Sequence, residues 1–534
     1  MRTLIALAAV VLVAGCGPGK FSERASAGKE HVLRYALATS PVTLDPVKVQ
    51  DVDTHDLLRQ VFEGLVDWSE DNQLVPELAE SWEVSEDGKT YTFTLKPAKF
   101  HNGRTIAAGD FKWTMERNLS PAYNSPTAQT YLDDIVGAKE FADGKAKEVS
   151  GIRALDDRTL QIEIEEPRAY FLGKLTYPPA QVVAKEAIPD GGEIKAIEQM
   201  VGTGPFKGDR FVPDQLVRLL PFEDYHGEKA KVTALERPII KDSATRVNKY
   251  RSGELEWIGL DRQELPTFER DPEFKDQIQF VNRPATVYLG MNPGGYEPFA
   301  DRDVRRAIGM AVDKEKIVKD VMRGVVQVAG GILPPAVPGY RDNPESLPFD
   351  PAEAKRLLAR AGYPDPSRMP ELILTIREQT PDTRIVGEAL ITQLRENLGI
   401  PAKMQTLEWK TMLERRNKKQ LGFFVMSWYA DYLDPQNFLS LLFAGYSPHN
   451  SLNYANPEVD ALCRSADSFA GPVDERMRLY QRAEDRILQD APWVPLYYVR
   501  DVVLIRPRVE GLRFNGFGAM TMESVTLDPA RDPK

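Results

Sequence analysis

The sequence predicts an α/β protein of two or three domains, with an antiparallel, strand-rich N-terminal part and a parallel sheet nearer the C-terminus. The chain has 534 residues, whereas one domain typically has roughly 100–200 residues. Residues 32–166 contain short alternating strands and a hairpin motif, which are typical of an antiparallel sheet. Residues 371–430 alternate between strand and helix patterns, as parallel β-α-β units do.

The elements of the N-terminal part follow from local patterns. Residues 32–46 begin as an alternating strand and end in a proline-bounded loop, and residues 53–66 fit a short amphipathic helix. The run SWEVSEDGKTYTFTLK carries two β-rich stretches around Asp87 and Gly88, which predicts a hairpin. Asp110 is placed to start a helix, and residues 156–166 read as another strand.

The pattern changes near residue 285. Residues 301–324 form a long helical stretch with Gly324 placed to cap it, and a second helix is closed by Gly362. Strand patterns at 371–378, 400–407 and 421–430 alternate with helix patterns, the first of which stops at Gly399. A further helix at 474–489 precedes a β-like run at 494–505. The predicted parallel sheet therefore consists of three strands with helices on its faces.

The third of these strands ends in WYADYLDP, residues 428–435, where aromatic residues surround Asp431 and Asp434. In open α/β sheets, ligands bind just outside the carboxyl ends of the strands, so this is a candidate site. Paired acids are consistent with general acid/base chemistry, and an acid among aromatic residues is consistent with a pocket for a cation. A structural alternative remains for each acid: Asp434 starts the turn before Pro435, and Asp431 caps a helix or loop.

Other chemistry finds little support in the sequence. The net charge is −11, which argues against a nucleic-acid partner, and the five histidines lack metal-site spacing. There is no GxSxG motif for a nucleophilic serine. The run from Gly202 to Gly208 resembles a dinucleotide loop, but Pro205 stands where a helix should begin, which favours a turn. We therefore predict no cofactor, no metal site and no enzymatic activity.

The N-terminus has the pattern of an export signal. Arg2 precedes an apolar run at 4–13 that is too short to span a bilayer, and the ending VAGC resembles a bacterial lipobox. This predicts a signal peptide at 1–15, lipidation of Cys16 and a flexible tether at 16–30, although an ordinary signal peptide with a chance cysteine would share the pattern. We expect Cys463 to be buried and unreactive.

Six motifs spread along the chain form a recognisable set. Two are TLDP at 43–46 and FEGLVDW at 62–68. The others are LVPELAESWEVSEDGKTYTFTLKPAKFHNG, GTGPFK, DVRRAIGMAVDKEKI and WYADYLDP. In these motifs the chain resembles the bacterial extracellular solute-binding proteins of family 5, the oligopeptide- and dipeptide-binding lipoproteins of ABC importers. The resemblance runs from about residue 32 to near the C-terminus.

The resemblance implies a periplasmic binding protein type II-like fold, in which two lobes close over a ligand in a central cleft. Strand crossings near 282–289 and 492–498 would form the hinge. The implied division places an inserted sub-domain of lobe I at 76–194 and lobe II at 286–494. Lobe I then comprises residues 31–75, 195–285 and 495–534.

The resemblance also implies site residues. Asp431 would accept the α-ammonium group of a peptide, and Ser427, Trp428 and Tyr429 would pair with its backbone or stack on it. By strand alternation, we expect either Trp428 or Tyr429 to point into the core. Thr39 and Ser40 lie where lobe I usually meets the ligand. For a ligand carboxylate, the sequence offers by general position only three arginines: Arg283, Arg377 and Arg384.

The function implied is a membrane-tethered, monomeric receptor at the periplasmic or cell-surface face that delivers peptides to ABC permease subunits. Relatives in this family also take up nickel chelates, haem, opines or oligosaccharides, and the shared motifs do not separate these ligands. A secreted hydrolase acting through Asp431 and Asp434 is the alternative from another functional class.

Overall fold

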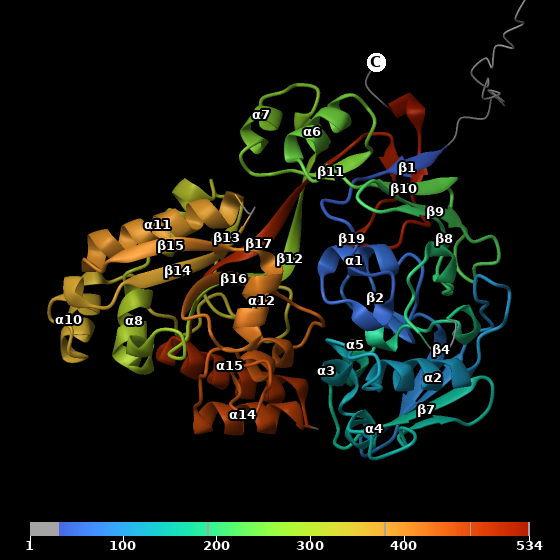
Figure 1. Ribbon diagram of the computed structural model, residues 1–534, viewed down its shortest axis with the longest axis horizontal. Helices are drawn as coiled ribbons and strands as arrows, with labels where there is room; N and C mark the ends of the chain where they lie inside the picture. The colour runs from blue at the N-terminus through green and yellow to red at the C-terminus, as the bar shows by residue number, and fades with distance from the viewer. Residues whose placement is uncertain (1–30, 189–191, 379–380, 470, 532–534) are drawn as a thin grey trace, which may run out of the picture.

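The computed structural model describes residues 31–188, 192–378, 381–469 and 471–531. The predicted signal peptide, the lipidated Cys16 and the tether lie outside the described residues. Among the described residues, no helix has the length and apolar composition needed to cross a membrane. Figure 1 shows two bodies side by side, the body on the right containing most of the N-terminal half of the chain.

Two four-stranded sheets build the body on the right, which we call lobe I. One has the order β1-β10-β9-β8, with a parallel pair only between β1 and β10, and the other has the antiparallel order β4-β5-β7-β6. The second sheet belongs to the inserted sub-domain. The strands are β1 (Val32–Arg34), β4 (Ala79–Val84), β5 (Thr90–Leu95), β6 (Ile152–Ala154), β7 (Thr159–Glu163), β8 (Phe206–Val212), β9 (Leu216–Pro221) and β10 (Ala234–Pro238).

The predicted hairpin is confirmed, because β4 and β5 pair on either side of Gly88, which has a φ of +71°. The strand predicted within 156–166 and the helix predicted near Asp110 are also confirmed. The helix predicted at 53–66 ends earlier than expected, at Leu58. The helices of this lobe are α1 (Val52–Leu58), α2 (Ala108–Leu119), α3 (Ala128–Leu132), α4 (Ala138–Ala142), α5 (Phe171–Lys174), α6 (Ser243–Arg251) and α7 (Leu265–Glu269).

A seven-stranded sheet forms the centre of the body on the left, lobe II, while β11 and the ends of β12 and β17 that pair beside it extend toward lobe I. Its order is β11-β17-β12-β16-β14-β15, with β13 also paired to β17. The predicted parallel unit is confirmed, since β15 and β16 both run parallel to β14. The strands are β11 (Trp257–Gly259), β12 (Ile278–Met291), β13 (Gln327–Val328), β14 (Leu372–Arg377), β15 (Ala402–Leu407), β16 (Phe423–Tyr429) and β17 (Trp493–Ile505).

The helical stretch predicted at 301–324 is interrupted. Helix α8 ends at Met310, and a new helical segment begins after Asp313, whose side chain accepts a hydrogen bond from the N–H of Lys316. Gly324 closes the stretch at a φ of +71°. The stretch thus consists of α8 (Arg302–Met310), α9 (Lys314–Lys316) and a π-helical turn (Ile317–Val321). The other helices of lobe II are α10 (Pro351–Arg360), α11 (Pro381–Leu398), α12 (Trp409–Asn417), α13 (Leu439–Phe443), α14 (Pro457–Asp467) and α15 (Val473–Asp490).

Strands β12 and β17 run between the two lobes (Figure 1). They pair antiparallel, and the register shifts between Asn282 and Thr286 and again between Val287 and Tyr288. Beyond the interruption, β12 also pairs with β16, so its second half belongs to the sheet of lobe II. Three two-stranded sheets complete lobe I: β2 (Val66–Trp68) with β3 (Leu74–Pro76), β18 (Val509–Glu510) with β21 (Thr526–Leu527), and β19 (Phe514–Asn515) with β20 (Gly518–Ala519).

The glycine run near residue 204 is a packing feature of lobe I. The N–H of Gly204 donates to the carbonyl of Val61 at 2.9 Å. A Cβ atom at Gly202 would lie 2.0 Å from that carbonyl oxygen, and one at Gly204 would lie 2.7 Å from the carbonyl oxygen of Gln60. The glycines therefore allow two backbone segments to touch, as the turn interpretation predicts and a phosphate-binding loop would not require.

Candidate ligand-binding site

The end of β16 has a free edge. Along its whole length, Phe423–Tyr429, the strand pairs with β12, but β14 pairs with it only at Phe423 and Phe424. Beyond Phe424, no strand in the described part of the chain occupies the second edge, and Ser427 is exposed there. The backbone groups on this edge are therefore available to an extended ligand.

Trp428 and Tyr429 point to opposite faces of the sheet, and both are half-buried. Trp428 packs against one hydrophobic core of lobe II, and its Nε1 donates to Oδ1 of Asn437 at 3.0 Å. Tyr429 packs against the other core of the lobe, with the guanidinium carbon of Arg283 5.8 Å from its ring centroid. Strand alternation therefore places the rings on opposite faces, but both of them, rather than one, point toward a core and stay partly accessible.

Asp431 lies two residues after the end of β16, and its hydrogen bonds are with the neutral side chain of Asn437. Its N–H donates to Oδ1 of Asn437 at 3.1 Å, and Nδ2 of Asn437 donates to its carboxylate at 3.4 Å. Burial raises the pKa of Asp431 to about 6, while hydrogen bonding from Tyr131 and Asn437 and the charge of Arg416 act against the rise. No lysine or arginine of the described chain lies within ion-pair distance of this carboxylate. Such an acid favours a cationic partner.

Tyrosine rings from both lobes surround Asp431. Tyr131 of α3 stacks on Tyr177 at 4.0 Å between ring centroids and meets Tyr432 edge-on at 6.3 Å. Tyr432 in turn stacks with Tyr170 at 6.0 Å. The charge of Asp431 adds to the burial that raises the pKa values of Tyr131 and Tyr177. The acid of lobe II therefore lies against aromatic residues of the inserted sub-domain, in a site that both lobes build.

Asp434 has a different environment from Asp431. The side chain of Arg476 donates to both of its carboxylate oxygens, at 2.7 and 2.8 Å, and the pair is buried. Asp434 also accepts a hydrogen bond from the N–H of Gln436 at 3.0 Å, at the start of a short 3-10 helix. The turn-forming role predicted for Asp434 is confirmed. A buried, bidentate partner of arginine is a poor general acid or base, so this geometry does not support a catalytic pair.

Thr39 and Ser40, the two residues predicted to meet the ligand from lobe I, have different surroundings. Ser40 exchanges hydrogen bonds with Asp214 of the β8–β9 connection, at 3.0 and 3.1 Å. Its hydroxyl is therefore used within lobe I. Thr39 is exposed. No contact of the described residues links either side chain to Asp431.

The three arginines proposed for a ligand carboxylate occupy distinct places. Arg283 donates to the carbonyl of Phe517 at 2.7 Å, near the strand crossing. Arg377 lies over the ring of Trp409 at 4.7 Å, at the end of β14. Arg384 forms an exposed pair with Glu388, one turn further along α11. Arg384 is thus a surface residue of the helix.

Sequence reasoning missed Arg416 of α12, which approaches the site from the strand side. Its guanidinium carbon lies 5.7 Å from the ring centroid of Trp428, and its charge acts on Asp431. No carboxylate in the described chain forms an ion pair with it. Neither Arg416 nor Tyr131 stands out in the sequence, because α12 and α3 are brought to the site by the tertiary fold.

Two further cavities lie away from Asp431. A groove of about 610 Å³ lies on the inserted sub-domain, between α2 and the segment around Lys185. A smaller cavity of about 310 Å³ adjoins the crossing of β12 and β17. Cys463 lies in neither cavity; it is buried, and burial raises the pKa of its thiol to about 12, as expected for an unreactive cysteine.

Comparisons with known proteins agree with this architecture. Residues 73–450 match the family described as bacterial extracellular solute-binding proteins, family 5, middle. The chain is 29% identical over 505 residues to the dipeptide-binding protein DppE of Bacillus subtilis; the aligned residues cover 92% of this chain and 91% of that protein. It is 30% identical over 533 residues to the probable deoxycholate-binding periplasmic protein YgiS of Escherichia coli, which covers 96% of each.

Among solved structures, the murein tripeptide binding protein MppA of Escherichia coli has a TM-score of 0.83 at 26% identity, covering 94% of this chain and 99% of that one. A second structure of MppA, described as an unliganded open form, has a TM-score of 0.74. The fold is that of a type II periplasmic binding protein with two lobes and an inserted sub-domain. The chain belongs to family 5 of the bacterial extracellular solute-binding proteins.

Proposed function

We propose that this protein is the peptide-capturing receptor of an ABC importer and that Asp431 binds the amino terminus of the peptide. Family membership supports the solute-binding role. One observation carries the choice of ligand: a carboxylate without a cationic partner in the described chain lies at the end of a strand whose second edge is free. An extended chain with a positive end satisfies both features.

The chemistry at Asp431 suits an ammonium group. An ion pair in an enclosed site of low effective dielectric is stronger than the same pair in water. The surrounding tyrosine rings exclude water and present π faces, which attract a cation. A bound ammonium would also offset the cost of keeping Asp431 ionised in the buried site.

The backbone of Ser427, Trp428 and Tyr429 would pair with the backbone of the peptide. Strand addition of this kind derives affinity from main-chain hydrogen bonds, which are the same for every sequence. It therefore suits a receptor for peptides of varied composition. We also propose that Thr39 and Ser40 meet the ligand from lobe I, where the hydroxyl of Ser40 would have to exchange its hydrogen bond to Asp214 for one to the ligand.

We propose that Arg416 binds a carboxylate of the ligand that lies close to the amino end of the peptide. It is the cation of the described chain that acts on Asp431, and it forms no ion pair there. A peptide places acidic groups close to its ammonium whenever it is short or carries an acidic residue near its start. Arg416 would then supply a second charge-assisted contact.

We also propose that the lobes close over the ligand by bending of β12 and β17. The register interruption after Asn282 marks a place where these strands can change direction. The domain division that follows is lobe I at 31–75, 195–285 and 495–534, the inserted sub-domain at 76–194 and lobe II at 286–494. Closure brings Tyr131 of the sub-domain against Asp431, which encloses the ammonium.

Other solutes are the second candidate. The similarity to YgiS and the tyrosine-lined surroundings of Asp431 favour an amphipathic solute of another class, and nickel chelates, haem, opines and oligosaccharides are also ligands in this family. Asp431 would repel an acidic solute, whereas it attracts an amine. The geometry does not support a hydrolase, because the ion pair with Arg476 holds the carboxylate of Asp434, the second of the two acids that such a reaction would need.

The deciding experiment has two parts. Mass spectrometry of the ligand released when the purified protein is denatured should identify peptides. Calorimetry should then show that Asp431→Ala weakens binding of a free-amine peptide by about 2–5 kcal/mol, whereas Asp143→Asn, which changes an exposed acid paired with Lys145, leaves it unchanged. Equal binding of free-amine and N-acetylated peptides by the wild-type protein would exclude the anchor role.

The membrane anchor and partners complete the proposal. We propose that lipid on Cys16 holds a monomer at the outer face of a membrane, where it delivers its ligand to the permease subunits. Labelling with radioactive palmitate in growing cells should mark the wild-type protein. Loss of that label in Cys16→Ser, together with release of the variant from the membrane fraction, is the expected result.

A further inference from the structure

Tyr432 of lobe II is buried against lobe I. It follows Asp431 in the loop after β16, and only 1% of it is exposed. Its ring stacks on Tyr170 at 6.0 Å and meets Tyr131 edge-on at 6.3 Å, and both partners belong to the inserted sub-domain. One hydrophobic core therefore extends across both lobes, directly beside the proposed ligand anchor.

Gly173 of α5 provides the space for this side chain. A Cβ atom at Gly173 would lie 3.0 Å from Cβ of Tyr432, so one of the two would have to move. The nearest atom of lobe I is Cζ2 of Trp68, at 3.4 Å, which is at the edge of ordinary van der Waals contact. The crowding at residue 173 thus comes from the opposite lobe.

The backbone of lobe I does not require a glycine at this position. Gly173 is not among the glycines with positive φ, so alanine can adopt its conformation, and alanine is the more favourable residue in a helix. The carbonyl of Gly173 accepts a hydrogen bond from the hydroxyl of Thr176 at 2.8 Å, and that hydroxyl accepts one from Nε1 of Trp68 at 3.0 Å. Lobe I therefore holds the slot in shape by its own contacts.

The contact between Tyr432 and the slot depends on shape alone. The hydroxyl of Tyr432 bonds with the side chain of Gln436, in its own loop. No residue of lobe I in the described chain exchanges a hydrogen bond with Tyr432. What crosses between the lobes is a ring packed against rings and a glycine, and such packing weakens steeply with separation.

A second contact joins the lobes beside the slot. The hydroxyl of Thr130 and Nε2 of His449 lie 2.8 Å apart, which connects α3 to the loop after α13. Figure 1 shows α3 at the border between the two bodies. Thr130 directly precedes Tyr131, so both contacts are close to the ring that approaches Asp431. The lobes thus meet next to the proposed anchor.

From these observations we propose that Gly173 and Tyr432 form the closing contact between the lobes, an inference that rests on the proposed function. Tyr432 is a positioning residue: when the lobes close, its ring enters the slot and brings the adjacent Asp431 to Tyr131. Gly173 is the counterpart that must stay small. The size of residue 173 thereby determines how far the lobes can close, although the glycine is not needed for lobe I to fold.

The test compares Gly173→Ala with the matched control Gly109→Ala. Both replace a helical glycine of the inserted sub-domain, but nothing lies within 4 Å of a Cβ atom at Gly109. Small-angle X-ray scattering gives the radius of gyration of each ligand-free protein, before and after addition of the small-molecule extract released from denatured wild-type protein. The extract should reduce the radius of the wild type and the control, whereas Gly173→Ala should need about tenfold more extract or keep the larger radius.

Two scattering outcomes overturn the proposal: equal closure by Gly173→Ala and the wild type, or a wild-type radius that the extract leaves unchanged. Urea unfolding of the ligand-free proteins supplies the second measurement. Gly173→Ala should unfold at the same urea concentration as the wild type or slightly above it, because alanine favours the helix. A clear loss of stability without ligand would show that the glycine serves folding, and would also overturn the proposal.

Trialanine in place of the extract separates this proposal from the peptide ligand. A wild type that closes with the extract but not with trialanine, while Gly173→Ala closes with neither, speaks against the peptide and supports the closing contact. Equal closure of both proteins with trialanine supports the peptide and overturns the closing contact.

Discussion

The guanidinium of Arg476 donates hydrogen bonds to both carboxylate oxygens of Asp434, at 2.7 and 2.8 Å, in the interior of lobe II. The two residues are 42 positions apart, and the pair joins the loop after β16 to helix α15. The ring of Tyr170 from the inserted sub-domain lies 5.9 Å from the same guanidinium. The ion pair thus supports the loop that positions Asp431.

Removing one partner of this pair should destabilise the protein strongly. Asp434→Asn leaves a buried guanidinium without its counter-charge, and we expect a loss of about 3–5 kcal/mol in the free energy of unfolding. Urea denaturation followed by circular dichroism measures it. The double variant Asp434→Leu with Arg476→Met should lose less than the single variant. A single variant as stable as the wild type would show that the pair is not needed.

The raised pKa of Asp431 predicts a pH-dependent stability. Its pKa of about 6 lies above the ordinary 3.8, so the native protein prefers the protonated acid. The ionised form is therefore a cost that is fully present above about pH 6 and disappears as the pH falls toward 3.8. Asp431→Asn should raise the stability by about 3 kcal/mol near neutral pH, with a difference that shrinks on acidification. A constant difference across that range would contradict the shift.

The same group predicts the pH dependence of binding. An ammonium ligand requires ionised Asp431, so affinity for a free-amine peptide should fall by about tenfold for each pH unit below about pH 6. Calorimetry at several pH values in buffers of different ionisation enthalpy should also detect proton release on binding. In Asp431→Asn this dependence should vanish, and its persistence there would assign it to another residue.

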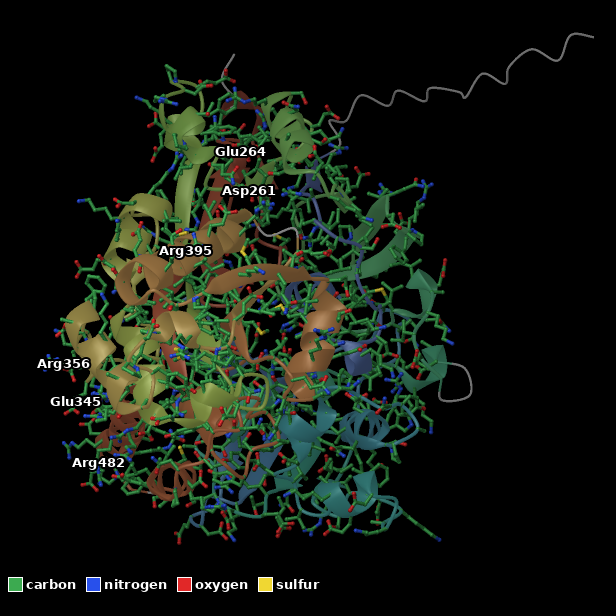
Figure 2. The ribbon with its side chains drawn as sticks, turned by 60° about the vertical axis from the view of Figure 1, so that its left-hand side comes forward. Asp261, Glu264, Glu345, Arg356, Arg395 and Arg482 are labelled. Atoms are coloured by element: carbon green, nitrogen blue, oxygen red, sulfur yellow. The ribbon has the colours of Figure 1, made fainter. Side chains whose placement is uncertain are left out.

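Arg262 and Asp382 form an ion pair of 2.5 Å between the segment after β11 and helix α11 of lobe II. Figure 2 shows Asp261 and Glu264, the neighbours of Arg262 in that segment, close to the helices of lobe II. Arg262→Gln should speed ligand dissociation by about three- to tenfold, corresponding to roughly 1 kcal/mol for a partly buried pair. Stopped-flow fluorescence measures the rate.

The control for this prediction is Arg384→Gln on the same helix. Arg384 pairs with Glu388 at the surface, 68% of its side chain is exposed, and the pair joins two residues of one element. Its loss should leave the dissociation rate unchanged. Faster dissociation in both variants would point to a general effect on α11 rather than to a contact between the lobes.

The close approach at Gly204 predicts a large effect from one methyl group. In Gly204→Ala, the added Cβ would meet the backbone of Gln60 at 2.7 Å, and we expect a loss of about 1–3 kcal/mol from overpacking. Gly109→Ala is the control, since nothing lies within 4 Å of the added atom and the site is in helix α2. The control should be neutral or slightly stabilising, by up to about 1 kcal/mol. Differential scanning calorimetry compares the two.

Much of the fold was predictable, because its elements carry strong local signals. The hairpin at Gly88 and the helix stop at Gly399 depend on residues with positive φ, which a short stretch of sequence identifies. The break after Met310 was missed because apolar spacing continues through it, while the side chain of Asp313 starts a new turn. The spacing of apolar residues shows which face of a helix is buried, but it does not reveal where one helix ends and another begins on the same face.

The candidate site was predictable only where it lies in one segment. The run after β16 contains the acid, the open edge and the turn-forming Asp434 together, so sequence alone located them. Tyr131 and Arg476 come from distant elements, and Arg416 comes from the helix just before β16; the packed structure brings all three to that run. Side-chain contacts between different elements leave no periodic signal in a single sequence, whether the residues are 42 positions apart, as Asp434 and Arg476 are, or much closer.

The free edge of β16 has a further consequence for solution behaviour. An unpaired strand edge normally templates association with other molecules, and proteins shield such edges. Here the shield is the opposite lobe, since Tyr131 and Tyr170 lie over the loop that follows the strand. A guest must therefore fit between the lobes before it can add to the sheet. The same geometry would offer hydrogen bonds to a short extended chain while hindering edge-to-edge pairing with a second folded copy.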